Sequence, residues 1–276
     1  MFKIRPFLQS DIVSAHALSI SLNWPHRLAD WQMMVDLGRG YVACAGTDIL
    51  GTSLWWPYGD DHGSIGMVIV SPAAQGRGIG RAIMDRLLAD VQGRTIHLNS
   101  TEAGIKLYQR LGFEPVGTIR QFQGMAVSGN LNDHLQTVRS ATVNDLAALN
   151  AAEKNATGLD RKQVLVRLLK DGNGVIAVDA ASIVSYAFRR NFGRGELIGP
   201  VVASSEAMAK SLIGSLISTA RGFVRIDCIE PQSSLASWLV ARGLADCGPV
   251  TRMVRGALPT LDKGSRQFAV ASQAFG

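Results

Sequence analysis

A strand, a glycine-rich loop and a helix follow one another between residues 64 and 90, and this stretch constrains the fold more than any other. Residues 65–70 form a short apolar run rich in β-branched side chains, which predicts a buried strand. Pro72 ends it, because proline cannot donate a hydrogen bond to a neighbouring strand. After Arg81, apolar residues recur at helical spacing, at positions 83, 84, 87, 88 and 91.

The loop between this strand and helix carries three glycines, Gly76, Gly78 and Gly80. Glycines allow successive backbone N–H groups to converge, and the helix that follows adds its positive end, so the loop predicts a phosphate or diphosphate site. Neither the G-x-G-x-x-G pattern of dinucleotide-binding proteins nor the G-K-[ST] ending of a Walker loop is present.

The pattern that matches is Q-x-x-G-x-G, formed by Gln75, Gly78 and Gly80, and it resembles the pyrophosphate loop of the GNAT acetyltransferase superfamily. The resemblance implies acetyl-CoA as the cofactor, with coenzyme A as its product. It also implies that the strand before the loop separates from its neighbour and binds the pantetheine arm. The cofactor-binding residues implied in this way are Val68, Ile69, Val70, Gln75, Gly76, Arg77, Gly78, Ile79, Gly80, Arg81 and, by a hydroxyl contact, Thr101.

A second signature lies downstream at residues 101–113, where a short predicted helix carries Tyr108 and ends at Gly112-Phe113. Gly112 suits a left-handed helix stop, and Phe113 begins the next strand. This segment resembles the second GNAT motif. The expected element order is a strand, helices at 11–22 and 28–37, strands at 41–45, 50–56 and 65–70, the helix after the glycine loop, a strand at 95–99, the Tyr108 helix and a strand over 113–127.

The second half of the chain repeats the first, which indicates a duplicated fold. Three residues recur after a spacing of 134 positions, namely Arg5 as Arg139, Asp11 as Asp145 and Gly40 as Gly174. We therefore expect an α/β (α+β) protein with two consecutive GNAT-like folds, each a mixed, mainly antiparallel sheet flanked by helices. The expected domains are residues 1–130, which bind acetyl-CoA, and residues 136–276, which are degenerate, with a polar joint over 128–137.

The two copies differ in their chemistry. Residues 202–209 stand where the first copy has its glycine loop, yet they contain no glycine, and Glu206 would repel a diphosphate. Leu239 stands where Tyr108 is expected by counting back from Gly243. The sequence therefore predicts one active centre, in the first copy, with the second copy as a wall, lid or substrate-site partner. The apolar stretch 267–276 is expected to dock against the protein.

Composition narrows the functional classes. The net charge is +6, but the 28 Lys and Arg residues form no dense cluster, so nucleic-acid binding is not expected. No apolar run approaches the length of a membrane span, and the N-terminus lacks the apolar core of a secretion signal. Three scattered cysteines show no metal-ligand or disulfide spacing, which favours reduced thiols, no metal and a cytoplasmic location. A homodimer is compatible with these features.

Direct acetyl transfer to an amine in a ternary complex needs no covalent enzyme intermediate. Tyr108 suits the general acid for the leaving thiolate. The expected oxyanion donor is the N–H of Ile69 or Val70. GNAT enzymes often place a glutamate on the fourth strand as the base, but residues 64–70 contain no carboxylate. Asp60, Asp61, His62, His26 and a water relay remain open, and we take Asp61 and His62 as candidate catalytic residues beside Tyr108.

The acceptor site is expected between the first interhelical loop and the end of the third strand, with Trp24, His26, Arg27, Trp56 and Tyr58 as candidate substrate-binding residues. Trp55 and Trp56 must point to opposite faces of their strand, so one of them belongs to ordinary packing. The expected function is N-acetylation of a small amine such as an amino acid, amino sugar or polyamine. The alternatives are acetylation of protein N-termini or lysines, and a non-catalytic acyl-CoA sensor.

Overall fold

The computed structural model describes residues 1–127, 138–178, 184–261 and 264–276. The predicted polar joint at 128–137 lies outside the described residues. The first half contains β1 (Lys3–Pro6), α1 (Ile12–Ser21), α2 (Leu28–Leu37), β2 (Arg39–Ala45), β3 (Asp48–Tyr58), β4 (His62–Val70), α3 (Ile79–Asp90), β5 (Thr95–Ser100), α4 (Glu102–Arg110) and β6 (Glu114–Met125). No described helix is long and apolar enough to cross a membrane.

The second half repeats this order. It contains β7 (Arg139–Ser140), α5 (Leu146–Thr157), α6 (Lys162–Asp171), β8 (Asn173–Val178), β9 (Val184–Phe192), β10 (Gly195–Ala203), α7 (Glu206–Ser218), β11 (Phe223–Ile229), α8 (Ser233–Ala241), β12 (Ala245–Arg255) and β13 (Arg266–Ala269). The element order predicted from the sequence is confirmed in both halves, and β13 is one strand beyond the repeat.

Local contacts confirm the duplication. In the first half, Arg5 donates to Asp11, which also accepts the backbone N–H of Leu8 and so holds the start of α1. In the second half, Arg139 and Asp145 form the same pair, and Asp145 accepts the N–H of Thr142 at 2.8 Å. The same ion pair therefore begins the first helix in each copy.

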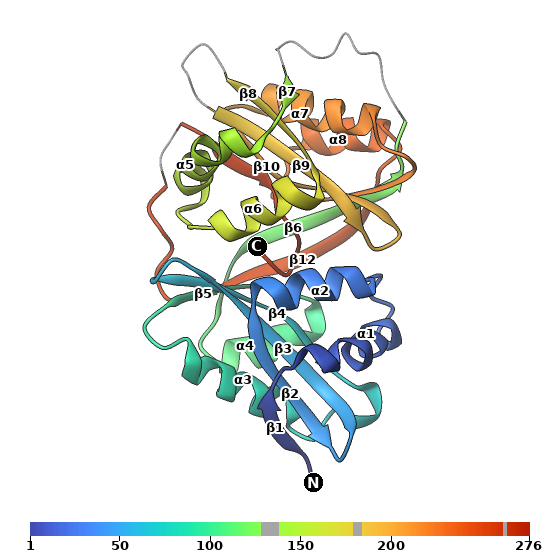
Figure 1. The fold of residues 1–276 in the computed structure, drawn as a ribbon, viewed down its shortest axis with the longest axis vertical. Helices are drawn as coiled ribbons and strands as arrows, with labels where there is room; N and C mark the ends of the chain where they lie inside the picture. Colours follow the sequence, from blue (N-terminus) through green and yellow to red (C-terminus); the bar gives the residue numbers. More distant parts are fainter. Residues whose placement is uncertain (128–137, 179–183, 262–263) are drawn as a thin grey trace.

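The two halves share one sheet because they exchange their last strands. The strand order is β1-β2-β3-β4-β5-β12-β6-β11-β13-β10-β9-β8-β7. Strand β12 of the second half pairs with β5 of the first, from Ile96↔Arg255 to Ser100↔Thr251. Strand β6 of the first half pairs through residues 119–125 with the whole length of β11 of the second. The two exchanged strands cross the middle of the molecule side by side (Figure 1).

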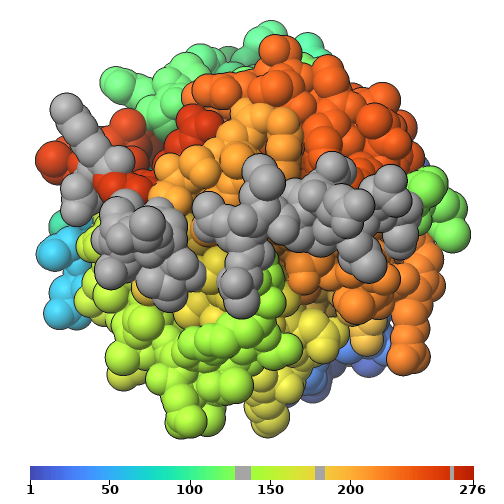
Figure 2. Space-filling model, turned by 90° about the horizontal axis from the view of Figure 1, so that it is seen from above, coloured from blue at the N-terminus to red at the C-terminus, as the bar shows by residue number. Residues whose placement is uncertain are grey.

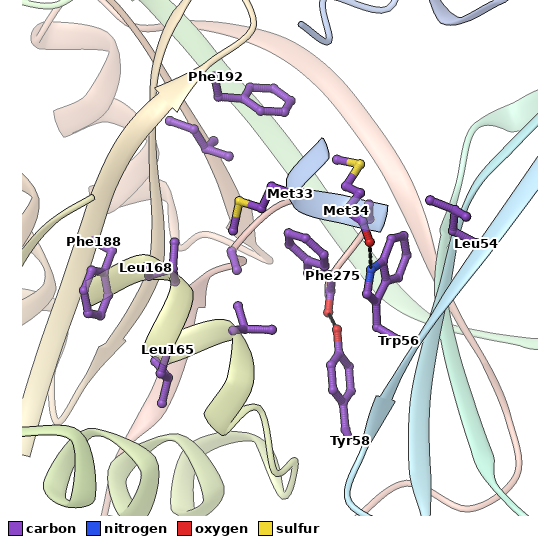
Figure 3. Close-up of a cluster of buried hydrophobic side chains, with 14 of the residues drawn as sticks. Met33, Met34, Leu54, Trp56, Tyr58, Leu165, Leu168, Phe188, Phe192 and Phe275 are labelled. Atoms are coloured by element: carbon purple, nitrogen blue, oxygen red, sulfur yellow. Dashed lines mark hydrogen bonds between the residues drawn. The ribbon is translucent and has the colours of Figure 1, made fainter. Parts of the chain in front are cut away.

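Three buried apolar clusters cover the faces of this sheet. One lies under α3 and α4 of the first half, and another lies under α7 and α8 of the second. The third lies between the halves, where α1 and α2 face α5 and α6 (Figure 3). Trp55 belongs to the α3 side and Trp56 to the interface between the halves, which confirms that the two indoles point to opposite faces.

The last residues of the chain dock as the sequence predicts. Strand β13 lies beside β10 and β11, and residues 268–272 are buried. The segment then runs into the interface, where the ring of Phe275 packs edge-on against Trp56 at 5.0 Å between ring centroids. Side chains hold its backbone from both halves, since Tyr58 donates to the carbonyl of Phe275 and Arg161 to that of Gly276. Seen from the end opposite the N-terminus, most of the visible surface belongs to the second half (Figure 2).

We predict that Phe275→Ala destabilises the protein by about 3–5 kcal/mol, because it removes a fully buried aromatic side chain and leaves a cavity between the halves. Urea unfolding followed by circular dichroism measures this change. Val13→Ala is the control, since Val13 is 68% exposed on α1. Equal midpoints for the two variants would show that the docked segment contributes little to stability.

Candidate active site

The glycine loop forms an open helix start. Gly78 adopts a left-handed conformation at φ +77° and is the N-cap of α3, without a side chain that caps the helix. A Cβ atom at Gly76 or Gly78 would meet nothing within 4 Å, so both glycines border open space. Gln75 donates to the carbonyl of Val70 at 3.2 Å and thereby ties the loop to the end of β4. The first-turn N–H groups of α3 are left without a side-chain cap, as an anion site requires.

The two strands beside this loop separate from each other. Strands β4 and β5 pair in parallel from His62↔Thr95 to Ile65↔Leu98, and the pairing ends there. Strand β4 then bulges, since the register with β3 shifts between Thr52 and Leu54 and Met67 takes φ +52°. The hydroxyl of Thr52 donates to the Met67 carbonyl at 2.7 Å and supports the bulge. The result is a gap between neighbouring strands that leads away from the glycine loop.

A cavity of about 390 Å³ lies at this gap, with walls from both halves of the chain. The first half contributes the loop 23–26, residues 65–68 of β4, Asn99 of β5, Thr101 before α4, and Tyr108 in the last turn of α4. Strands of the interface contribute Gln121, Gln123 and Val250. The second half contributes Phe192, Arg194, Arg225 and residues 272–274. None of the described residues that line it is an aspartate or glutamate.

Tyr108 places a phenol in the cavity. Its ring is 8% exposed and packs beside Gly104, where a Cβ atom would come within 2.8 Å of the ring. Among the described residues, none forms a hydrogen bond with its hydroxyl group. Burial raises the pKa of Tyr108, because it disfavours the phenolate. The hydroxyl therefore keeps its proton and is free to donate it.

His26 is the imidazole that lines the cavity. Burial lowers its pKa to about 4, with a further contribution from Arg225 and Arg190, so the ring is neutral at pH 7. Its Nδ1 is buried without a partner among the described residues. The ring packs edge-on against Phe192 of the second half, with 5.2 Å between ring centroids. A neutral ring with one free nitrogen can accept or donate a hydrogen bond there.

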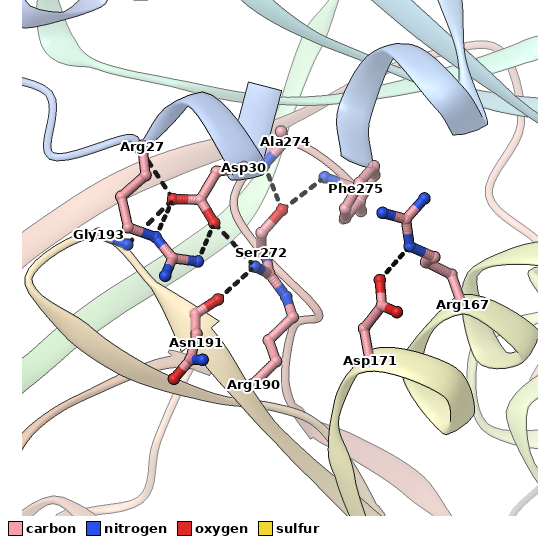
Figure 4. Close-up of polar contacts among 10 residues, drawn as sticks. All are labelled: Arg27, Asp30, Arg167, Asp171, Arg190, Asn191, Gly193, Ser272, Ala274 and Phe275. Atoms are coloured by element: carbon pink, nitrogen blue, oxygen red, sulfur yellow. Dashed lines mark hydrogen bonds and ion pairs between the residues drawn. The ribbon is translucent and has the colours of Figure 1, made fainter. Parts of the chain in front are cut away.

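A buried carboxylate holds the loop with His26 against the second half. Asp30 of α2 accepts two hydrogen bonds from the side chain of Arg27 and one from the backbone N–H of Gly193, and it lies 3.4 Å from Nη1 of Arg190 (Figure 4). Burial alone would raise the pKa of Asp30, but the hydrogen bonds from Arg27 and Gly193 hold it below its ordinary value. The β9–β10 turn is thereby fixed beside the cavity.

The β9–β10 turn and β11 supply two arginines to the cavity. Arg194 is exposed, and no hydrogen bond or ion pair with another described residue engages it. Arg225 forms a bidentate pair with the buried Asp227, with 2.9 Å between Nη2 and Oδ2. Of these two arginines, Arg194 therefore brings an unpaired positive charge to the cavity, whereas the charge of Arg225 is compensated by Asp227.

The structure brings part of the predicted site together. Val68, Thr101, Tyr108, Trp24 and His26 all line the cavity. Gln75, Gly76, Arg77, Gly78, Ile79 and Gly80 form the loop beside the gap, and Arg81 pairs with Asp85 on the surface of α3. Ile69 and Val70 lie in register with β3, beyond the cavity lining.

Five predicted residues lie elsewhere. Asp61 is exposed in the β3–β4 turn, and His62 pairs with His97 at the far end of β4, so the geometry supports a catalytic role for neither. The Arg27 side chain is engaged by Asp30. Trp56 donates to the Met34 carbonyl and Tyr58 to that of Phe275, which makes both part of the interface core.

Several cavity residues escape sequence reasoning. Gln121 and Gln123 are two residues apart on β6, so their side chains lie on the same face of the strand, and this spacing was the signal in the sequence that could have placed them together. Arg194, Arg225 and residues 272–274 come from the second half, and a reading that places the site in residues 1–130 does not reach them. Asn99 stands two residues before the predicted Thr101.

The corresponding strand gap and helix start in the second half are blocked. Strands β10 and β11 also part after Ile198↔Ile226, but β13 fills the gap and pairs with both. The start of α7 is capped, since the Ser205 hydroxyl accepts the N–H of Met208 at 3.2 Å. Glu206 pairs with Lys210. Leu239 stands at the position of Tyr108, buried in the core.

The fold and the two sequence signatures together define the class of acetyltransferases. Residues 36–115 match the family model of an acetyltransferase (GNAT) domain, and residues 150–269 match a second model with the same description. The chain belongs to the GNAT N-acetyltransferase superfamily as a tandem of two such domains.

Relatives of similar length share this architecture. The chain is 27% identical over 263 residues to the uncharacterized N-acetyltransferase YitH of Bacillus subtilis, covering 92% of this chain and 91% of that protein. It superimposes on a Pyrococcus horikoshii structure assigned as an acetyltransferase with a TM-score of 0.83 at 20% identity, covering 100% and 96% of the two chains. A tandem GNAT protein from the clavulanic acid biosynthesis pathway gives 0.62 at 14% identity, covering 94% and 100%.

We predict that stability falls as the pH drops from about 6.5 to 4. Burial lowers the pKa of both His26 and His97 to about 4, whereas an unfolded histidine titrates near 6.5. In this window the unfolded chain binds more protons than the folded one, so folding becomes less favourable. Urea midpoints at pH 7 and pH 5 measure the effect, and His26→Asn should reduce the difference between them. If the urea midpoint falls by the same amount between pH 7 and pH 5 in His26→Asn and in the unsubstituted protein, His26 does not contribute to this pH dependence.

Proposed function

We propose that the protein transfers an acetyl group from acetyl-CoA to the amine of a small molecule. The observation that carries this proposal is the placement of the Tyr108 hydroxyl in a cavity at the open end of the β4–β5 gap, next to an uncapped, glycine-rich helix start. The same three features are absent or blocked at the corresponding place in the second half, among the residues that the structure describes.

The donor side suits a diphosphate attached to a long arm. Gly76 and Gly78 leave room for anionic oxygen atoms close to the backbone, and the start of α3 offers N–H groups and the positive end of the helix dipole. Arg77 is exposed beside them. In the gap between β4 and β5, an extended arm could form hydrogen bonds with the backbone groups of both strands.

The acceptor side favours a small molecule with an anionic group. The second half forms one wall of the cavity, which leaves less room for a peptide segment than an open groove would. No described lining residue is acidic, and the unpaired charge of Arg194 on that wall favours an amine that carries a carboxylate, such as an amino acid, over a polyamine.

The residues of the cavity divide the chemistry among them. Acetyl-CoA, when bound, supplies an acetyl thioester. The N–H of Val68, in the bulge of β4, is the candidate donor to the carbonyl oxygen, in place of Ile69 or Val70, because Val68 lines the cavity. Tyr108 holds the proton for the departing thiolate. Because its low pKa makes the neutral ring of His26 a weak base, His26 would position a water that passes the amine proton on to solvent.

We predict that Tyr108→Phe lowers kcat by about 10²–10⁴-fold and changes the Kd for coenzyme A by less than about twofold, because a general acid acts on the reaction and not on cofactor binding. Thiol release in an amine panel measures turnover, and calorimetry measures binding. Tyr41→Phe is the matched control, since that phenol bonds Asp90 outside the cavity. Undiminished turnover in Tyr108→Phe would contradict the assignment of Tyr108, and binding without turnover by the unsubstituted protein would favour an acyl-CoA sensor.

We predict that Gly78→Asp raises the Kd for coenzyme A by at least about tenfold, because an aspartate there caps α3 and repels the diphosphate. Gly93→Asp is a close control, since Gly93 has φ +82° and similarly open surroundings but lies in the α3–β5 turn. Both variants should lose about 1–2 kcal/mol of stability from the left-handed backbone. Equal cofactor affinities in the two variants would place the diphosphate elsewhere.

A further inference from the structure

A second cavity, of about 340 Å³, lies in the second half at the position that corresponds to the catalytic cavity. The end of α5 and the α5–α6 connector line it through Thr157 and Leu159, as the α1–α2 connector lines the first cavity. The end of β11 and the start of α8 replace the end of β5 and the start of α4. Strand β12 contributes Arg252 and Met253, where the first cavity has Gln121 and Gln123 of β6.

This second cavity lacks the parts needed for acyl transfer. Strand β13 occupies the gap between β10 and β11, where a donor arm would enter. Ser205 caps the helix start, and Leu239 replaces the tyrosine. The cavity is thus a counterpart of an acceptor site that has no donor site beside it.

The cavity does retain groups that recognise a ligand. Arg252 is partly buried, which lowers its pKa, and no hydrogen bond or ion pair with another described residue engages its guanidinium group. The side-chain nitrogen of Gln267 is also buried without a partner among the described residues. Glu230 also lines the cavity; its charge opposes the lowering of the Arg252 pKa without forming an ion pair, and its carboxylate accepts the N–H of Thr118 at 3.3 Å. The unpaired guanidinium group of Arg252 and the buried amide nitrogen of Gln267 together favour an anionic group as their partner.

Apolar side chains complete the walls. Leu98, Leu159, Met253, Phe268 and Phe275 line the cavity, and Leu258 and Leu261, each about half exposed, stand beside them. His97 adds a ring that its lowered pKa keeps neutral. A ligand with one anionic group and an apolar body would therefore satisfy Arg252 and cover these side chains.

One segment of the chain borders both cavities. Gln267, Phe268, Phe275 and Gly276 line the second cavity, whereas residues 272–274 between them line the catalytic one. Asn99 lines both, and its side chain donates to the carbonyl of Gln273 at 2.8 Å. Any ligand that changes the position of the segment in one cavity changes a wall of the other.

We propose that the second cavity is a binding site for a small organic anion with an apolar body, and that its occupation is sensed at the catalytic cavity through residues 266–276. The anion pairs with Arg252, and the body packs between β12 and the α5–α6 connector. The proposal does not depend on the acetyl donor or acceptor, because binding at this site requires no acetyl transfer.

The test uses 3-phenylpropionate as the probe, with the uncharged 3-phenylpropanamide beside it, on the full chain. Calorimetry should show saturable binding of the carboxylate, at least about tenfold weaker binding of the amide, and a loss of at least about tenfold in Arg252→Gln. Arg255→Gln is the matched control on the same strand, since Arg255 is exposed and does not line the cavity. Equal binding of acid and amide by the unsubstituted protein, or no binding, overturns the site even if Arg252→Gln does not fold.

Hydrogen exchange tests the coupling between the cavities. The carboxylate should slow amide exchange across residues 270–276 in the unsubstituted protein and in Arg255→Gln, and should leave it unchanged in Arg252→Gln. The coupling must also be reciprocal. An acceptor that binds in the catalytic cavity should change the Kd of the carboxylate by a certain factor, and the carboxylate should change the Kd of the acceptor by the same factor. Carboxylate binding that leaves exchange in this segment unchanged overturns the coupling.

Discussion

The exchange of the last strands is the constraint on which the rest of this structure depends. Strand β12 of the second half is the hydrogen-bond partner of β5, and β6 of the first half is the partner of β11. Without the second half, β5 would lack this neighbour, and without the first half, β11 would lack its own. The exchange also brings the two halves to face each other through α1, α2, α5 and α6. Both cavities are therefore built from both halves, although each belongs to one repeat.

The duplicated halves diverged in their use of one geometric feature. In each, two parallel strands part after a short paired stretch, and a helix begins nearby. The first half leaves the gap open and begins its helix with Gly78, whose lack of a side chain exposes the N–H groups. The second half fills the gap with β13 and begins its helix with Ser205. Similar architecture thus gives an uncapped helix start beside an open gap in one copy and a capped helix start beside a filled gap in the other.

Much of the fold follows from the sequence because its signals are local. The glycine loop, the Gly112 stop and the Arg5–Asp11 pair each act within a few residues, and the repetition of that pair as Arg139 and Asp145, 134 positions later, predicts the duplication. The strand exchange could not be predicted from the sequence. Either β6 or β12 could pair with β5 and bury the same alternating pattern of apolar side chains, so the pattern does not distinguish between them. For the same reason the site was predicted in part: Tyr108 and Thr101 sit on local motifs, whereas Arg225 and residues 272–274 reach the cavity through pairings distant in sequence.

The exchanged strands have a consequence for synthesis on the ribosome. The first half emerges with β5 complete, but its partner in the sheet, residues 251–255, follows only after most of the second half has been made. Until then the edge of β5 offers unpaired backbone groups, and pairings between such distant segments form slowly. The nascent first half must wait in an incomplete state, which makes its maturation a late event that depends on the whole chain.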